Sequence, residues 1–157
     1  MKKLSVYFFI ILIICSKAQA LPKCEGEDDT KWTNCQGTYL KKDVSKPGDE
    51  DKWTRDFTGE FGNIPGKRHG KGTSRSYKNG KFMFEFTGKF KDDFADGKGT
   101  STYDDGAKLI VSFKDGKRHG LGTYTHPDGT KFVGEFKDGA INGQINYEYA
   151  SGDVYVG

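Results

Sequence analysis

Histidine is the residue type in this chain that most readily suggests catalysis or metal binding. The three histidines are His69, His119 and His126. His69 and His119 both follow a Lys-Arg pair and precede a glycine, so they occupy the same position of a repeated pattern. A metal ion needs several ligands at one point, and equivalent positions in separate repeats are not expected to converge. We therefore expect neither a metal site nor a catalytic histidine.

Serines and paired carboxylates are the other candidates for catalysis. The serines lack the Gly-x-Ser-x-Gly context of a nucleophile elbow. The pairs Asp92-Asp93 and Asp104-Asp105 stand at predicted turns, where aspartate commonly shapes the backbone. The sequence thus contains no catalytic constellation that we recognise. It predicts a protein that is not an enzyme and that uses no cofactor.

Residues 1–20 have the pattern of a secretory signal peptide. A basic start and a short apolar run precede Ala-Gln-Ala at positions 18–20, as in signal peptides before their cleavage site. The apolar run is too short to cross a bilayer comfortably. Two alternatives remain open. One is an uncleaved anchor, and the other is a lipoprotein acylated at Cys15, although Ile14 stands where such sites prefer a small residue. The sequence predicts export to a periplasm or to the extracellular space.

Removal of the signal peptide would leave the chain without net charge. The full chain has a formal net charge of +3, and the signal peptide contains Lys2, Lys3 and Lys17 but no acidic residue. A neutral chain lacks the basic field that attracts nucleic acid. We therefore expect no nucleic-acid partner.

Two cysteines, Cys24 and Cys35, follow the predicted cleavage site. In an oxidising compartment an even pair of cysteines indicates a disulfide. A zinc site is the weaker interpretation, because no second cysteine pair and no nearby histidine would complete the ligand set. The sequence therefore predicts a Cys24–Cys35 disulfide.

Aromatic residues and glycines recur at a fixed spacing and must position any site in this chain. The first position of an aromatic-x-Gly-x-Phe motif falls at Phe57, Phe86, Leu109, Phe132 and Tyr155, the last four every 23 residues. Asp-Gly and Asn-Gly dipeptides between these segments are typical of tight hairpin turns. Alternation places Phe132, Gly134 and Phe136 on one face of a strand. The pattern predicts a series of β-hairpins.

Glycine is frequent in these predicted strands, although strand propensity disfavours it. A bare Cα lets a ring from a neighbouring strand lie flat against the backbone. We therefore expect a core of rings over glycines, except in the segment from Leu109 to Phe113, where aliphatic packing is expected. The glycines with an expected structural role are Gly59, Gly88, Gly120, Gly122 and Gly134.

Residues 21–56 form a distinct N-terminal part, which we expect to be a cap stapled by the disulfide. Residues 21–34 are polar and predict a solvated arm. Cys35-Gln-Gly-Thr-Tyr39 matches the glycine-rich half of the later repeats and indicates a degenerate repeat. Mixed charge around a Pro-Gly turn in 40–56 predicts a surface loop. The regular array is expected over residues 57–157.

The regular repeats resemble the MORN repeat (membrane occupation and recognition nexus). The clearest segments are Phe132-Val-Gly-Glu-Phe-Lys-Asp-Gly139 and Gly116-Lys-Arg-His-Gly-Leu-Gly-Thr-Tyr124. The resemblance implies an all-β fold, in which hairpins of about 23 residues stack into an elongated, single-layer antiparallel sheet. It implies little about activity. MORN arrays occur in membrane-junction proteins, lipid kinases, a histone methyltransferase and cytoskeletal scaffolds, and in the enzymes the chemistry lies in another domain.

The aromatic face is the candidate binding surface, because a single-layer sheet cannot bury both faces by itself. The simpler interpretation, that the rings are only the core, stays open. The candidate surface residues are Phe57, Phe61, Phe86, Phe90, Phe113, Tyr124, Phe132, Phe136 and Tyr147. Basic side chains in the repeated Lys-Arg-His triplets are candidate phosphate contacts. They are Lys67, Arg68, Lys117 and Arg118.

We therefore expect an exported, non-enzymatic scaffold or binding protein, whose partner is a protein or a component of the cell envelope. Peripheral attachment to a membrane through lipid headgroups is the alternative. A hydrolase acting on envelope material is a third interpretation, and the lack of a catalytic constellation in the sequence argues against it.

Overall fold

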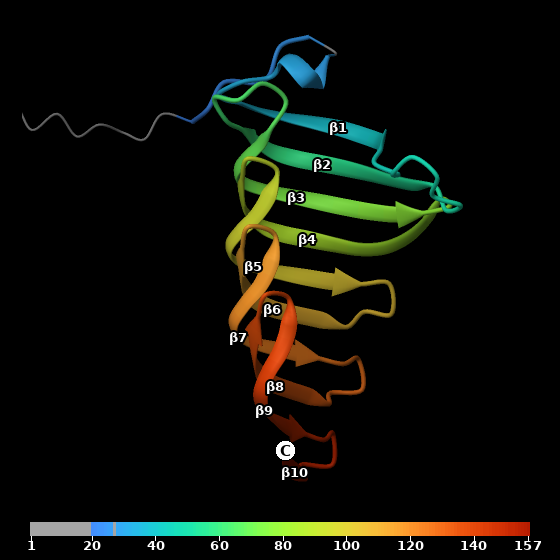
Figure 1. Cartoon of the computed structure of the whole chain (residues 1–157), viewed down its shortest axis with the longest axis vertical. Helices are drawn as coiled ribbons and strands as arrows, with labels where there is room; N and C mark the ends of the chain where they lie inside the picture. The colour runs from blue at the N-terminus through green and yellow to red at the C-terminus, as the bar shows by residue number, and fades with distance from the viewer. Residues whose placement is uncertain (1–19, 27) are drawn as a thin grey trace, which may run out of the picture.

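The computed structural model describes residues 20–26 and 28–157 as an all-β protein (Figure 1). The predicted signal peptide therefore lies outside the described residues, except for Ala20. Ten strands form one antiparallel sheet, and their order in the sheet is their order in the chain. The strands are β1 (Cys35–Asp43), β2 (Trp53–Phe61), β3 (Arg68–Lys78), β4 (Lys81–Lys91), β5 (Phe94–Tyr103), β6 (Lys108–Lys114), β7 (Lys117–Thr125), β8 (Lys131–Lys137), β9 (Ala140–Glu148) and β10 (Val154–Val156). The predicted fold of stacked hairpins is confirmed.

The tight turns between strands follow the dipeptides that predicted them. Asn79, Asp115 and Asp138 have positive φ values of 50°, 50° and 52°, and each precedes a glycine that also has positive φ. This left-handed backbone matches the twist of the flanking strands and closes a hairpin within two residues. Local sequence alone is therefore sufficient to place these turns.

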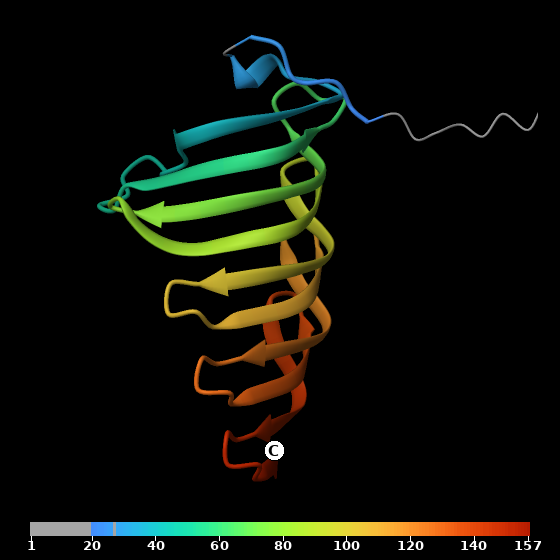
Figure 2. The ribbon, with the colours of Figure 1, turned by 180° about the vertical axis from the view of Figure 1, so that it is seen from behind.

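A bulge that contains a left-handed glycine recurs in alternate strand pairs and bends the sheet. The register slips in each of the pairs β2–β3, β4–β5, β6–β7 and β8–β9. A glycine with positive φ accompanies each slip; these are Gly70, Gly97, Gly120 and Gly143. A bulge strengthens the local twist and bends the strand. The strands consequently curl, and the sheet is long and bent across its width (Figures 1 and 2). We call its concave face, which carries buried rings such as Phe57, Phe86 and Phe136, the trough.

Gly120 has a role different from the one expected. A Cβ added at Gly120 would meet nothing within 4 Å, whereas its φ is +74°. The residue therefore provides a left-handed backbone for the bulge and does not support a ring. A period-two pattern places Gly120 on the face of Gly122, but it cannot show that the strand is bulged there.

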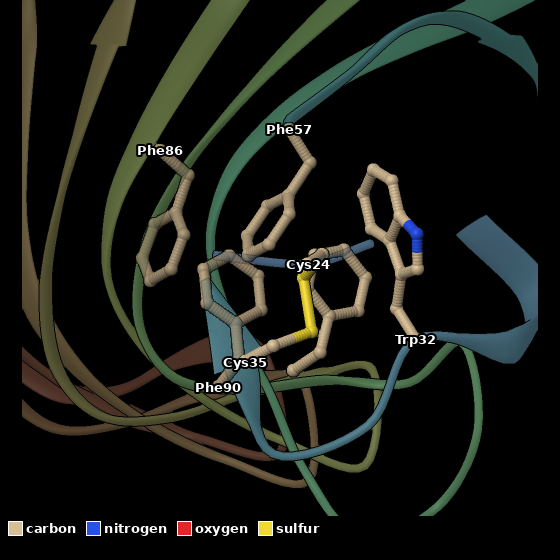
Figure 3. Packing of buried hydrophobic residues seen from close by; sticks show 7 residues of the cluster. Cys24, Trp32, Cys35, Phe57, Phe86 and Phe90 are labelled. Carbon is tan, nitrogen blue, oxygen red and sulfur yellow. A yellow bond between two sulfur atoms is a disulfide. The ribbon is translucent and has the colours of Figure 1, made fainter. Parts of the chain in front are cut away.

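Packed rings such as Phe57, Phe86 and Phe90 form the core of the N-terminal half of the trough (Figure 3), and glycines lie against these rings. A Cβ added at Gly59 or at Gly72 would lie 2.7 Å or 2.5 Å from the ring of Phe57. Phe86 covers Gly99 of the neighbouring strand in the same way, at 2.3 Å. The predicted packing is present, with one correction. A ring covers a glycine on its own strand as well as one on the neighbouring strand.

The C-terminal half has a second, smaller core. Leu109, Val111 and Phe136 are buried there, with half-buried rings packed around them. The aliphatic packing predicted for the segment that begins at Leu109 is therefore present. Gly122 lies where aromatic and aliphatic packing meet, because a Cβ added there would approach both the Phe136 ring and Val111 Cγ2.

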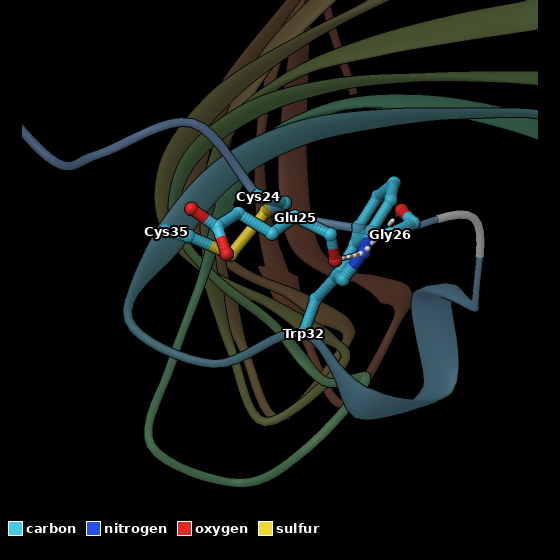
Figure 4. Close-up of a disulfide and its surroundings, with 5 residues drawn as sticks. All are labelled: Cys24, Glu25, Gly26, Trp32 and Cys35. Atoms are coloured by element: carbon cyan, nitrogen blue, oxygen red, sulfur yellow. Dashed lines mark hydrogen bonds between the residues drawn. A yellow bond between two sulfur atoms is a disulfide. The ribbon is translucent and has the colours of Figure 1, made fainter.

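The N-terminal arm closes one end of the trough. Cys24 and Cys35 form a disulfide, as predicted, with their Cα atoms 5.0 Å apart. Trp32 donates hydrogen bonds from Nε1 to the carbonyl oxygens of Glu25 and Gly26, each at 3.1 Å (Figure 4). Its ring packs edge-on against Phe61, with the centroids 5.1 Å apart.

The expectation of a solvated arm over residues 21–34 is therefore wrong for part of its length. Trp32 is only 8% exposed, and Cys24 belongs to the same buried cluster as the phenylalanines (Figure 3). Burial of these two side chains covers the aromatic core at β1, which would otherwise end in water. The sheet also crosses the expected domain boundary at residue 57 without a break, because β1 pairs with β2.

A candidate binding trough

A continuous row of half-buried rings crosses the C-terminal half of the trough. Tyr103, Tyr124, Phe132 and Tyr147 come from β5, β7, β8 and β9. Successive ring centroids lie 6.1, 6.0 and 5.8 Å apart. These distances are typical of interacting aromatic pairs. The rings also line a hollow of about 410 Å³ together with Leu109 and other residues, which we call the C-terminal hollow.

The structure divides the candidate surface residues into two groups. The buried group forms the core and consists of Phe57, Phe61, Phe86, Phe90 and Phe136. The half-buried group faces the trough and consists of Phe113, Tyr124, Phe132 and Tyr147. The second group offers more ring surface to a partner than the first, although buried rings such as Phe86 also line part of the trough. The sequence pattern did not separate the two groups, because both alternate with outward-facing residues in the same way.

The two arginines of the Lys-Arg-His triplets hold rings in place. The guanidinium carbon of Arg68 lies 4.9 Å from the centroid of Phe90, and that of Arg118 lies 5.2 Å from the centroid of Phe136. Cations at such distances over a ring face are attracted to it. Both arginines are therefore engaged with the protein instead of extending towards a phosphate. Lys67 pairs with Asp93 at 3.3 Å, and Lys117 is exposed.

Asp93 fixes the position of Arg68. Its carboxylate accepts hydrogen bonds from the backbone nitrogen and from Nε of Arg68, both at 3.1 Å. Partial burial raises the pKa of Asp93. The hydrogen bonds and the charge of Arg68, helped by Lys67, outweigh that effect and hold the pKa below its ordinary value. The carboxylate is thus ionised at neutral pH and neutralises Arg68.

A second hollow interrupts the aromatic surface in the N-terminal half. Tyrosine follows Gly-Thr at Tyr39 and Tyr124, but serine takes this place in the two central hairpins, at Ser74 and Ser101. The register places Ser74 and Ser101 on either side of Phe86. Loss of two rings leaves a hollow of about 440 Å³, which we call the N-terminal hollow. Sequence reasoning missed it, although the change from Gly-Thr-Tyr to Gly-Thr-Ser was visible.

Arg55 is a further residue that the sequence did not single out. It lines the N-terminal hollow together with Arg68 and Asp93. No repeat position marked it, because it lies before the first regular repeat. Its importance depends on the bend of the sheet, which brings β2 over the same hollow as the turn between β4 and β5.

The histidines have local acidic neighbours. His69 Nδ1 lies 3.4 Å from Asp92, and His126 Nδ1 lies 3.2 Å from Asp128. Among the residues that the structure describes, no group of three or more histidine, cysteine or acidic side chains is arranged to hold a metal ion. Within the same residues, no helix is long and apolar enough to cross a bilayer.

Comparison with known proteins identifies the repeats. A family model described as the MORN repeat matches four segments, residues 66–81, 86–108, 112–131 and 132–154. Together these segments make up more than half of the 157 residues. No curated protein matches the chain.

Proposed function

Because the chain belongs to the MORN-repeat family, we propose that it is a non-enzymatic scaffold whose trough binds a protein partner. MORN repeats are consistent with a scaffold or binding role. The observation that carries the proposal is the row of half-buried rings from Tyr103 to Tyr147. The row continues from β5 over β6, where Leu109 lines the same hollow, to β7, β8 and β9. Tyrosine and other aromatic residues are enriched among the residues that dominate the binding energy of protein interfaces.

We further propose that the protein acts after export. A disulfide that buries both cysteines with Trp32 suits an oxidising compartment. The predicted signal peptide also supports export. The partner would then be a periplasmic or extracellular protein, or another component of the envelope.

Attachment to lipid headgroups has less support than protein binding. The two arginines expected to contact phosphate groups are held over Phe90 and Phe136. Sedimentation of the purified protein with neutral and anionic vesicles separates the two functions. We expect the protein to remain in the supernatant with both, and co-sedimentation with anionic vesicles would favour the lipid function.

Affinity capture from the native source tests the protein-binding proposal. The double variant Tyr124→Ser/Tyr147→Ser removes two rings and inserts the residue that the chain itself uses at this repeat position, in Ser74 and Ser101. We expect a partner captured by the parent protein to be lost. The matched control is Leu121→Ser, since Leu121 is 71% exposed and lies on the opposite face. A partner retained by the double variant and lost by the control would place the binding surface on the other face.

A further inference from the structure

The N-terminal hollow contains polar atoms that have no partner among the residues that the structure describes. Arg55 Nε and Ser76 Oγ are both buried, and neither has a hydrogen-bond partner in that part of the chain. Arg55 and Ser76 stand directly opposite each other on β2 and β3, so their side chains leave the same face as neighbours. Buried polar groups are nearly always hydrogen-bonded, and an unpaired one is costly. These atoms therefore indicate a missing acceptor.

The charges around the hollow do not balance. Three charged side chains line it: Arg55, Arg68 and Asp93. Asp93 accepts hydrogen bonds from Arg68 and neutralises it. Arg55 has no ion-pair partner among the described residues. Its pKa is lowered, first by burial and then by the positive charge of Arg68. One positive charge is thus partly desolvated and uncompensated inside the hollow.

The remaining walls of the hollow consist of aromatic rings and small side chains. Phe86 and Phe113 provide ring surfaces, and Ala95 closes the side that comes from β5. Ser74 and Ser101 form the floor where rings stand in other repeats. The hollow of about 440 Å³ falls within the size range of small-molecule sites. Such a site suits a ligand with an apolar body and one charged end.

We propose that the N-terminal hollow binds a small organic monocarboxylate, with its carboxylate at Arg55 and Ser76 and its apolar body against Phe86 and Phe113. A guanidinium presents two parallel N–H donors that match the two oxygens of a carboxylate. The single negative charge of the ligand equals the single uncompensated positive charge. A phosphate monoester carries about −1.5 to −2 at neutral pH and would bring excess charge into the hollow. The inference goes beyond the proposed binding of a protein partner, because it assigns a small ligand to the other half of the trough.

Titration calorimetry with three eight-carbon probes tests the ligand class. Octanoate, octanamide and octyl phosphate share an apolar tail and differ in the charge of the head. We expect octanoate to bind saturably to the purified protein, and octanamide to bind about tenfold or more weakly, the change expected for loss of a charge-assisted hydrogen bond. Octyl phosphate should bind more weakly than octanoate. Equal binding of octanoate and octanamide, or tighter binding of octyl phosphate, would overturn the assignment.

Three variants locate the binding. Arg55→Gln should weaken octanoate binding about tenfold or more, because the ligand loses its charged partner. The variant should keep its fold, because the substitution removes a buried charge that has no counter-ion. Arg75→Gln makes the same change on the opposite face, where Arg75 pairs with Glu85 at 2.7 Å, and should bind octanoate like the parent. Ser101→Tyr restores the ring found in other repeats, fills the hollow and should abolish binding.

Failure of this inference is distinguishable from failure of the proposed function. Absence of octanoate binding, or equal binding by Arg55→Gln and the parent, would refute the carboxylate site. The row of rings from Tyr103 to Tyr147 lies in the other half of the trough, so capture of a protein partner through Tyr124 does not depend on Arg55.

Discussion

The ring of Phe86 lies against Gly99 of the next strand, so closely that a Cβ added at Gly99 would come 2.3 Å from Cε2 of the ring. The ring cannot move aside easily. Phe90 and Phe113 pack edge-on against it, with centroids 5.3 and 5.0 Å away. The same relationship joins Phe57 to Gly72. Glycine therefore acts in this sheet as the complement of an aromatic ring.

We expect Gly99→Ala to lower the free energy of unfolding by about 1–3 kcal/mol through overpacking. Phe86→Leu removes the ring that the new methyl group would meet. The double variant should therefore lose less stability than the sum of the two single variants. Urea unfolding of all four proteins measures the coupling. Strict additivity would mean that Phe86 and Gly99 do not depend on each other.

Gly134→Val should destabilise the protein more than Val133→Thr. A Cβ added at Gly134 would lie 2.9 Å from Ile145 Cγ2 and 3.1 Å from Phe132 Cε2. We expect a cost of about 1–3 kcal/mol, despite the better strand propensity of valine. Val133 is half-buried on the opposite face, where threonine should cost about 1 kcal/mol or less. An unchanged urea midpoint for Gly134→Val would be inconsistent with this packing.

The fold was largely predictable from sequence because its signals are local. Asp115-Gly116 and Asp138-Gly139 specify their turns without help from distant residues, and the spacing of 23 residues shows that the hairpins repeat. The trough was not predictable in the same way. Its curvature depends on a left-handed backbone at glycines such as Gly120. The sequence shows that the residue is a glycine but does not show that its φ is positive.

The candidate site was predictable only in part, because burial depends on contacts between distant segments. Trp32 stands in a polar stretch, yet it is buried against Phe61 and over Gly37. Arg55 precedes the regular repeats, and only the folded sheet shows that its Nε lacks a partner within residues 20–26 and 28–157. The candidate residues included Tyr124, Phe132 and Tyr147 of the row but missed Tyr103. The sequence pattern also did not show which aromatic residues stay accessible.

Removal of the disulfide should destabilise the N-terminal cap. The cysteines are 11 residues apart, and closing a loop of this size contributes about 3 kcal/mol in the chain-entropy model. We expect Cys24→Ser/Cys35→Ser to unfold at lower urea and to expose Trp32. Tryptophan fluorescence follows that exposure when both proteins also carry Trp53→Phe, because the chain has a second tryptophan at position 53. An oxidised parent protein that contains two free thiols by mass spectrometry would refute the disulfide itself.

Acid should weaken the contact between Asp93 and Arg68. The folded-state pKa of Asp93 lies below its ordinary value of 3.8, so its stabilising contribution is present above that pH and is lost as the pH falls through the lower folded value. Asp93→Asn should be less stable at neutral pH by about 1–3 kcal/mol, because it leaves buried Arg68 without its counter-ion.

Urea midpoints measured between neutral pH and about pH 2 test this contribution. The parent should lose more stability than Asp93→Asn as the pH falls below about 4. The control is Asp96→Asn, which changes a half-buried carboxylate on the same strand pair away from the N-terminal hollow. If the urea midpoints of the parent and of Asp93→Asn fall equally as the pH is lowered, Asp93 does not make the proposed contribution to stability.

Site-specific photo-crosslinking in the native source tests most directly the claim that the trough is the binding face. A photoreactive phenylalanine analogue is placed at Tyr124, in the row of rings, or at Leu121, three residues earlier on the opposite face. We predict a discrete crosslinked partner from position 124 and none from position 121. Crosslinking from position 121 alone, or from neither position, would contradict the account.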